Sequence, residues 1–447
     1  MMTSHLLAEL SAQRRRARDS VSLVPFSECY AWKFDGDRVS HERDGFFSLV
    51  LVRATSNDEV LDSSEVLLID QPEVGILGFL VAPDIDGYKW LIQLKPEPGN
   101  IHLTQAAPSV QATESNFTQV HGGRPTSFLE YFTTIRSDTT TVTNTLQSEQ
   151  GDRFLGKYNR NSVVLVRDLA DTPPPEGWIW ANSTDLRAAL LEDFSLNTDA
   201  RSVLSCSDWG LISELPGRPF EGPSGQTNFG RQLLYSFGTG PRTEHTSKLM
   251  RLIETARAAV QLQVGLCAFN QSQSFVFRED GVFRRKPGIP EAQFFSVHMP
   301  MREVADWCQP LLISQEIQSV VLICANIAGV LKFLVRPYTE PGHLTGLQFG
   351  PSLQSGTGND KDNQVSISEH LSHCKLVAEV LQSDEGGRFF QSICRYQIVE
   401  LNPSSELPTR HHHQAWLTLA ELKAGLAIQG CFTNELRNAI SILLAWA

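Results

Sequence analysis

The pattern of apolar and polar residues predicts the same order of elements twice along the chain. In the first copy a helix is expected from Ser4 to about Ser20. Two apolar runs, 74–81 and 88–94, flank the turn sequence PDIDG and predict a β-hairpin. A second helix is expected over 127–146, although its TTTVTN stretch suits a helix poorly. A strand over 162–167 and a helix near 186–194 complete the unit.

The second copy repeats this pattern, with a helix over 243–262 and a hairpin made of 320–325 and 330–336. The sequences Asn182-x-x-Asp185 and Thr418-x-x-Glu421 both indicate a helix N-cap followed by an acidic residue three positions later. Each of these sequences stands near the end of its copy, so the order of elements is shared from beginning to end.

Short identical stretches support an internal duplication. LLIDQ at 67–71 matches LLISQ at 311–315, and PSVQAT at 108–113 matches PSLQSG at 351–356. GDRFLGKYNR at 151–160 matches GGRFFQSICR at 386–395. The matches follow one another in the same order in both copies, which chance does not explain. Two long copies exclude a solenoid and predict two similar α+β modules.

The two copies are separated by a segment rich in glycine and proline. Residues 210–241 contain seven glycines and four prolines, a composition typical of a linker or a long loop. We therefore expect a first module over 1–209, a connection over 210–241, and a second module over 242–447.

Composition narrows the class of protein. The net charge of −12 and the absence of a basic stripe argue against a nucleic-acid partner. Eight scattered cysteines without a CxxC pair are typical of reduced, buried thiols, and the N-terminus lacks the apolar core of a signal peptide. The most apolar stretch, 319–335, is too short to span a membrane. We therefore expect a cytoplasmic protein without a membrane partner.

The segment 111–124, QATESNFTQVHGGR, is the first candidate for chemistry. Gly122 and Gly123 would let the backbone approach a phosphate, and Arg124 can bind one through two hydrogen bonds. His121 titrates near neutrality and can move a proton, and Phe117 can stack on a base. The alternative is a hydrated surface loop with a Gly-Gly turn.

A second candidate is the basic cluster in EQGDRFLGKYNRN at 149–161. Arg153, Lys157 and Arg160 are spaced by four and three residues, so they would share a face in a helix and alternate in a strand. They could bind a phosphate, or they could form a solvated basic edge. The chain has no GxGxxG, GxxxxGK[ST] or GxSxG sequence, so the motifs support neither a nicotinamide site nor a covalent hydrolase.

The segments 109–132, 148–161 and 196–206, together with GGRFFQSICRYQIVEL and WLTLAELKAGL in the second copy, resemble the NDP-hexose 2,3-dehydratase family. The resemblance implies two tandem Nudix-like modules, each a mixed sheet packed by helices. It also implies a homodimer that acts on dTDP-4-keto-6-deoxy-D-glucose in deoxysugar biosynthesis. The product would pass to a 3-ketoreductase or an aminotransferase. No redox cofactor is expected, because electrons move only within the sugar. No metal is expected either, because the chain lacks the glutamate pattern of the Nudix box.

The family resemblance gives the candidate residues roles. His121 or Tyr131 would act as acid or base, with Glu130 as a competing base. Arg153, Lys157 and Arg160 would hold the diphosphate. The other residues expected to bind the substrate are Gln111, Thr113, Ser115, Asn116, Phe117, Gly122, Gly123 and Arg124.

The second copy departs from this pattern, because the His-Gly-Gly-Arg run has no counterpart after Gln354. We therefore expect an active pocket in the first module and a degenerate one in the second. Two alternatives stay open, a sugar-nucleotide-binding protein without activity and a Nudix-type sugar-nucleotide hydrolase.

Overall fold

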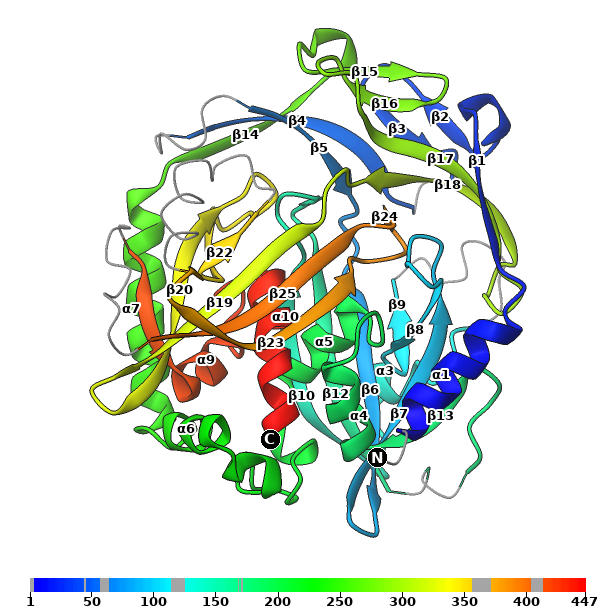
Figure 1. The fold of residues 1–447 in the computed structure, drawn as a ribbon. Coiled ribbons are helices and arrows are strands. Elements are labelled where there is room, and N and C mark those ends of the chain that lie inside the picture. The colour runs from blue at the N-terminus through cyan, green and yellow to red at the C-terminus, as the bar shows by residue number, and fades with distance from the viewer. Residues whose placement is uncertain are drawn as a thin grey trace.

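The structure is a computed structural model that describes residues 4–43, 46–56, 64–113, 125–167, 169, 172–355, 371–402 and 413–447. Within these residues the chain is of the α+β class, with strands in four mixed sheets (Figure 1). Two of these sheets lie in the lower part of the view and are called here the inner sheets. The other two arch over the top and are called the outer sheets.

The inner sheet of the first half has the strand order β10-β12-β6-β7-β13, with β8 beside β7 and β9 beside β6. The β6/β7 hairpin confirms the prediction, and β12 runs parallel to β6. Because β6 is buried along most of its length, its sequence is a continuous apolar run. The strands are β6 (Gly75–Asp84), β7 (Gly87–Pro96), β8 (Thr104–Ala107), β9 (Val110–Ala112), β10 (Thr139–Ser148), β12 (Tyr158–Val166) and β13 (Trp178–Asn182).

The inner sheet of the second half repeats this order as β23-β25-β19-β20-β26, with β21 beside β20 and β22 beside β19. The repeated sequence therefore corresponds to repeated topology, and the predicted β19/β20 hairpin is confirmed. Its strands are β19 (Gln318–Ile327), β20 (Val330–Thr339), β21 (Leu347–Gly350), β22 (Leu353–Gln354), β23 (Cys374–Ser383), β25 (Ile393–Leu401) and β26 (Ala415–Thr418).

Two buried helices join the halves. Helix α5 (Thr198–Cys206) packs on β6 and β12, α10 (Asn434–Leu443) packs on β19 and β25, and the two helices pack on each other. Every residue of both helices is buried, and one apolar core includes residues of both halves. The N-terminal helix α1 (His5–Arg16) and α4 (Ser183–Leu190) cover the first half, and α7 (Arg242–Ala259) and α9 (Leu419–Gly425) cover the second.

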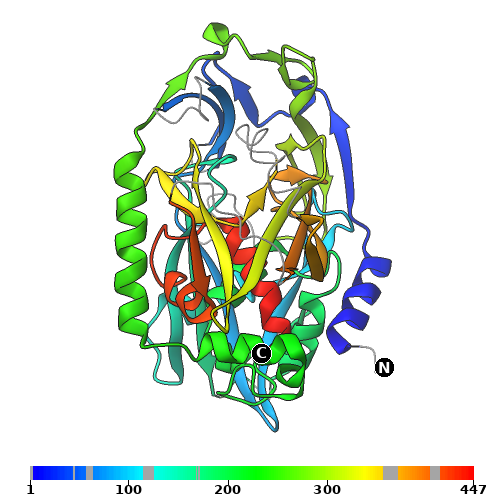
Figure 2. The same ribbon diagram turned by 60° about the vertical axis from the view of Figure 1, so that its left-hand side comes forward.

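The outer sheets exchange strands between the halves. Strand β1 of the first half pairs with β17, and β14 of the second half pairs with β4. Figures 1 and 2 show β1 extending from α1 to the far sheet and β14 extending from α7 to the other. One outer sheet contains β2 (Trp32–Phe34), β3 (Arg38–His41), β4 (Ser48–Ser56), β5 (Ser64–Asp70), β11 (Phe154–Leu155) and β14 (Leu262–Cys267). The other contains β1 (Ser20–Val24), β15 (Phe275–Arg278), β16 (Gly281–Arg284), β17 (Pro290–His298), β18 (Asp306–Ile313) and β24 (Phe389–Phe390).

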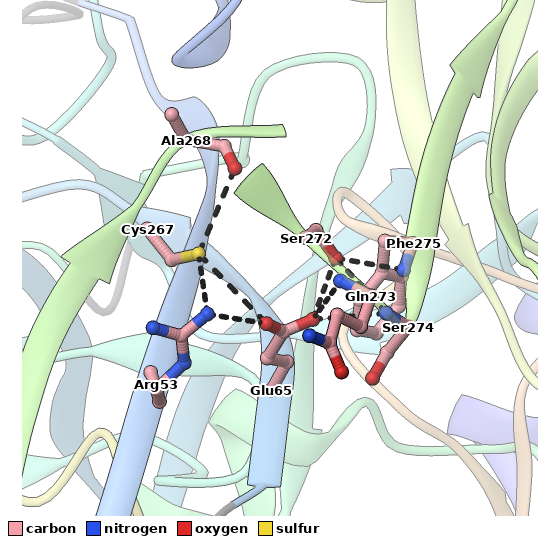
Figure 3. A network of polar contacts seen from close by, with 8 residues as sticks. All are labelled: Arg53, Glu65, Cys267, Ala268, Ser272, Gln273, Ser274 and Phe275. Atoms are coloured by element: carbon pink, nitrogen blue, oxygen red, sulfur yellow. Dashed lines mark hydrogen bonds and ion pairs between the residues drawn. The ribbon is translucent and has the colours of Figure 1, made fainter. Parts of the chain in front are cut away.

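A carboxylate on β5 holds the exchanged segment that follows β14 (Figure 3). Glu65 accepts hydrogen bonds from the Ser272 hydroxyl at 2.6 Å and from the Ser274 backbone N–H at 3.0 Å. It also accepts one from Arg53 at 2.7 Å. Burial acts to raise the pKa of Glu65, but the hydrogen bonds from Ser272, Arg53 and Ser274 outweigh it and lower the pKa to about 2. The charged form of Glu65 therefore stabilises the contact between the two halves.

Several local predictions can be compared with the structure. The helix expected over 127–146 is wrong, because only α3 (Glu130–Thr133) is helical and β10 follows. The threonines and Val142 are β-branched, and their pairing with β12 outweighs the apolar spacing. The predicted N-caps at Asn182 and Thr418 are confirmed.

The connection 210–241 is partly helical, since it includes α6 (Asn228–Phe237). Within the described ranges, no helix is long and apolar enough to cross a membrane.

Candidate functional site

A cavity of about 340 Å³ lies between the inner sheet of the first half and the two outer sheets. Its floor comes from the first half, and part of its wall comes from the second. The polar and charged residues that line it are His41, Glu42, Arg43, Gln71, Lys95, Glu97, Gln111, Thr113, Lys157, Asn159, Asp199, Arg302, Glu303, Gln309, Glu385 and Arg388.

Strand pairing brings the floor residues together. Asn159 at the start of β12 is in register with Gly75 at the start of β6, and Ala112 on β9 is in register with Ile76. The Asn159 side-chain oxygen accepts the Gly75 backbone N–H at 3.0 Å, and a Cβ at Gly75 would stand only 2.6 Å from that oxygen. The first turn of α5 adds Asp199, so several distant segments meet at one edge of the sheet.

Segments of the second half close the cavity. The turn 384–388, just before β24, supplies Glu385, Gly387 and Arg388. It is attached to the end of β7 by a hydrogen bond from Gly99 N–H to the Gly386 carbonyl at 2.7 Å. Arg302 donates to the Pro96 carbonyl at 3.0 Å, and Trp307 and Gln309 on β18 also line the cavity. The site is therefore composite, with chemistry-bearing side chains from both halves.

Glu97 is a fixed anion in the floor. Lys95 lies 3.3 Å from its carboxylate, Gln111 donates to it at 3.0 Å and Asn100 donates at 3.3 Å. Burial acts to raise the pKa of Glu97, but Lys95 and Arg302 outweigh burial and hold the pKa below its usual range. Burial lowers the pKa of Lys95, which Glu97 partly restores.

Two other carboxyl groups of the cavity have pKa values that are shifted in the opposite direction. Burial raises the pKa of Asp199 well above its usual range, and the neighbouring charges of Glu385 and Glu149 raise it further. Burial also raises the pKa of Glu385, to about 7, although Arg388 opposes the shift. Carboxyl groups whose environments separate their pKa values are a feature of acid–base sites. The cavity thus combines a carboxyl group whose pKa is lowered with two whose pKa values are raised, one of them to about 7.

Gly387 lies near two of these carboxyl groups. A Cβ built on Gly387 would lie 3.8 Å from an oxygen of Glu385 and 3.9 Å from an oxygen of Glu97. The two side chains therefore border the same small space, which the missing side chain leaves open.

The equivalent positions of the second half lack much of this chemistry. In the repeat alignment Glu97, Gln111 and Asp199 correspond to Glu340, Gln354 and Glu435. However, Lys95 corresponds to Tyr338, Lys157 to Ser392, Glu385 to Gln150 and Gly387 to Asp152. The equivalent region therefore keeps the acidic residues of the floor but lacks both lysines and the glutamate equivalent to Glu385.

The structure brings together only some of the residues predicted from sequence. Gln111, Thr113 and Lys157 line the cavity. Arg160 instead donates to Asn144 at 2.9 Å on an exposed edge, and Arg153 lies 3.6 Å from Asp152 outside the lining residues. The residues that lie outside the described residues are Ser115, Asn116, Phe117, His121, Gly122, Gly123 and Arg124.

Glu130 and Tyr131 do not line the cavity either. They belong to α3, which packs on the sheet face where Gly78 and Leu80 point, whereas the cavity residues Gly75 and Leu77 lie on the other face. Glu130 is exposed, and the Tyr131 ring lies 4.5 Å from the Arg136 guanidinium. The two residues therefore belong to a short helix that packs on the sheet, away from the cavity.

Sequence reasoning missed Lys95, Glu97, Asp199, Glu385 and Arg388. For Lys95 and Glu385 the signal lay in the comparison of the two copies, because these two residues change at positions where the surrounding sequence repeats. A residue that differs between otherwise matching copies indicates a role that only one copy retains.

Comparisons with known proteins give matches that cover nearly the whole chain. The family model for NDP-hexose 2,3-dehydratase matches residues 3–207 and 246–443. A dTDP-4-dehydro-6-deoxy-alpha-D-glucopyranose 2,3-dehydratase of Saccharopolyspora spinosa is 30% identical over 436 residues, covering 95% of this chain and 88% of the relative. Proteins of the same name from Amycolatopsis orientalis and Streptomyces violaceoruber are 28% and 29% identical. The alignment with the Amycolatopsis orientalis protein covers 100% of this chain and 91% of that relative. The alignment with the Streptomyces violaceoruber protein covers 95% of this chain and 93% of that relative.

The matched segments coincide with the two halves of the fold, and together they include every described element that lines the cavity. The chain belongs to the NDP-hexose 2,3-dehydratase family, a family of hydro-lyases in deoxysugar biosynthesis.

Proposed function

We propose that this enzyme removes the C2 hydroxyl of dTDP-4-keto-6-deoxy-D-glucose as water and that the reaction takes place in the composite cavity. The substrate follows the names of the three relatives. The observation that carries the location is the combination in one cavity of lysine and arginine side chains with carboxyl groups of separated pKa. The cavity volume of about 340 Å³ is within the range of small-molecule sites.

The C4 ketone of this substrate makes the C3 hydrogen acidic. A base takes the C3 proton, and the electron pair of that bond forms an enolate with the negative charge on the C4 oxygen. The C4 carbonyl then re-forms while the C2–O bond breaks, and a proton joins the leaving hydroxyl to give water. The remaining C3 enol tautomerises to a 3,4-diketo-2,6-dideoxy sugar nucleotide. The protein must therefore supply a base, a donor to the C4 oxygen and an acid for the hydroxyl.

The cavity offers residues for each of these tasks. Lys157 and Arg388 can neutralise the diphosphate. Trp307 and Phe46 offer aromatic faces for the base of the nucleotide. Asp199, whose pKa is raised well above its usual range by burial, can donate a proton. The predicted roles of His121 and Arg124 stay part of the proposal, since the segment they belong to continues from Thr113 in the cavity wall.

The proposal also assigns different roles to the two halves. We propose a catalytic first module over 1–209 and a degenerate second module over 242–447, both of Nudix-like ancestry. A homodimer and a downstream 3-ketoreductase or aminotransferase are likewise proposed, from the resemblance to the family. The loss of both lysines at the equivalent positions of the second half supports the assignment of the catalytic cavity.

The test is anaerobic incubation with dTDP-4-keto-6-deoxy-D-glucose, followed by a nicotinamide-dependent 3-ketoreductase that traps the unstable product. We expect a mass loss of one water before reduction, with and without EDTA. Binding of the nucleotide sugar without turnover would instead support a binding protein. Metal-dependent release of a nucleoside monophosphate would support a Nudix-type hydrolase.

A further inference from the structure

We infer that Glu385, a carboxylate of the second half, is the catalytic base that takes the C3 proton in the cavity of the first half. This inference rests on the proposed function and assigns one of its steps to a named atom group. It makes the second half a direct participant in catalysis, in addition to any role in stability.

The first argument is the position of the Glu385 turn. Gly99 donates its backbone N–H to the Gly386 carbonyl at 2.7 Å, and Gln391 donates its own to the Gly99 carbonyl at 2.7 Å. Arg388 donates to the side-chain oxygen of Gln71 at 3.2 Å and to the Gly387 carbonyl at 2.8 Å. These contacts hold the turn against the first half, so Glu385 faces the cavity from a fixed backbone.

The second argument compares the carboxyl groups that border the cavity. Glu97 receives hydrogen bonds from Gln111 and Asn100 and pairs with Lys95, so its oxygens are already engaged. Among the residues that the structure describes, none donates a hydrogen bond to the Glu385 carboxylate. A carboxylate oxygen of Glu385 lies 3.8 Å from the position that a Cβ of Gly387 would occupy, and one of Glu97 lies 3.9 Å from the same position. Glu385 is therefore positioned to accept a proton from a bound sugar.

The third argument is electrostatic and takes in the groups that face Glu385 from each neighbouring element. Burial raises the pKa of Glu385 to about 7, with Arg388 opposing the shift and Glu149 and Glu97 adding to it. A base with a pKa near the working pH combines a useful ionised fraction with proton affinity. The other charged and titratable groups that line the cavity are Lys157, Asp199, Lys95, Arg302, Glu303, His41, Glu42 and Arg43.

The equivalent turn of the first half, which contacts the second half, provides a natural contrast. At the position equivalent to Glu385 the chain has Gln150, whose amide cannot take up a proton. At the position equivalent to Gly387 it has Asp152. The pseudo-equivalent region thus has an amide at the position of the proposed base and a side chain at the position of Gly387, in agreement with a single catalytic cavity.

In the step assigned here, the Glu385 carboxylate forms an O–H bond to the C3 hydrogen while the C3–H bond breaks. The electron pair passes to C3=C4 and the negative charge to the C4 oxygen. Glu385 becomes a neutral carboxylic acid, and the proton is lost again to the leaving hydroxyl or to solvent in the later steps. No oxidant or reductant enters the balance.

The experiment compares wild-type enzyme with Glu385→Gln, using Glu379→Gln on β23 as the matched control. Glu379 is on the surface of the same half, where it bonds to Gln397. We expect Glu385→Gln to fold, because it replaces a buried, half-protonated acid with a neutral side chain of the same shape. Its kcat should fall by about 10²–10⁴-fold, and titration calorimetry should show that dTDP binding is retained. The control should keep wild-type kcat.

A second readout separates catalysis from support of the fold. Wild-type kcat should rise with pH through a limb near the pKa of Glu385, and Glu385→Asp should keep a limb at a shifted pH with a lower kcat. Wild-type turnover with an unchanged pH limb in Glu385→Gln would overturn the inference while leaving the proposed function intact. The absence of dehydration by wild-type enzyme would overturn the proposed function and the inference with it. If Glu385→Gln does not fold, an unchanged kcat and pH limb in Glu385→Asp would overturn the inference.

Discussion

The backbone N–H of Gly99 donates a 2.7 Å hydrogen bond to the carbonyl oxygen of Gly386, and the reverse contact occurs between Gly342 and Gly151 at 2.6 Å. Each half therefore inserts an equivalent turn into the other. In the first half the contact joins the strand end that carries Glu97 to the turn that carries Glu385. The turn that the first half inserts into the second contains Gln150 at the position equivalent to Glu385, so the same architecture leads to different chemistry.

Substitution of Gly99 should damage both the fold and the activity. A Cβ at this position would lie 1.6 Å from the Phe389 carbonyl oxygen, so the turn 384–388 would have to move. We expect Gly99→Ala to lower the free energy of unfolding by about 1–3 kcal/mol and to reduce kcat. Urea denaturation and the trapped-product assay measure these effects. Gly265→Ala is the control, because nothing lies within 4 Å of a Cβ there.

Gly387→Ala should separate activity from stability. The new methyl group would make only ordinary contacts, 3.8 Å from Glu385 and 3.9 Å from Glu97, so the free energy of unfolding should change little. The methyl group would nevertheless occupy the space between the two carboxyl groups, where the sugar is proposed to react. We expect KM to rise and kcat to fall. Wild-type kinetics in a stable Gly387→Ala protein would show that the sugar reacts elsewhere.

Much of the inner architecture could be predicted from sequence. The hairpins β6/β7 and β19/β20 combine apolar runs with a turn, and the N-caps at Asn182 and Thr418 follow from local hydrogen bonding. Local signals also misled where two tendencies competed. In the TTTVTN stretch of β10, β-branched side chains and pairing with β12 prevailed over apolar spacing typical of a helix.

The exchange of β1 and β14 could not be predicted, because the apolar pattern of a strand does not specify which sheet it pairs with. The choice of partner depends on the path of the chain in three dimensions. For the same reason, part of the site could not be predicted from sequence. Glu385 is 274 residues from Gln111 in the sequence, and only the crossing turn brings both to one cavity. Gln111, Thr113 and Lys157, which line the same cavity, could be proposed from sequence because they lie in continuous motifs.

The basic cluster of 149–161 offers a further test, because only Lys157 of its three cations lines the cavity. Lys157→Ser, which installs the residue of the equivalent position in the second half, should weaken dTDP binding by about 10–100-fold through loss of a charged hydrogen bond. Arg160→Ser should leave binding near wild type, since Arg160 bonds to Asn144 on an exposed edge. Titration calorimetry with dTDP measures both. Equal losses in the two variants would favour the original prediction that the whole cluster holds the diphosphate.

The Glu65 network should give the exchanged strands a measurable pH dependence. Hydrogen bonds from Ser272, Arg53 and Ser274 lower the pKa of Glu65 to about 2, against an ordinary value of 4.5, so the folded state favours the charged form. A lowered pKa stabilises the fold above the ordinary value, and this stabilisation is lost as the pH falls from about 4.5 towards 2. Glu65→Gln removes the charge while keeping the shape, and we expect it to reduce the free energy of unfolding at pH 7 by about 1–3 kcal/mol.

The difference in Tm between wild type and Glu65→Gln should be largest near pH 7 and should shrink below pH 4.5. The control is Glu379→Gln, whose carboxylate bonds to Gln397 and lies 4.0 Å from Arg395, both in its own sheet. A difference that stays constant down to pH 3 would mean that the Gln side chain disturbs packing and that the charge contributes nothing. Because Glu65 and its partners Ser272 and Ser274 belong to different halves, a pH-dependent difference would also show that charge on β5 helps to hold the exchanged segment in place.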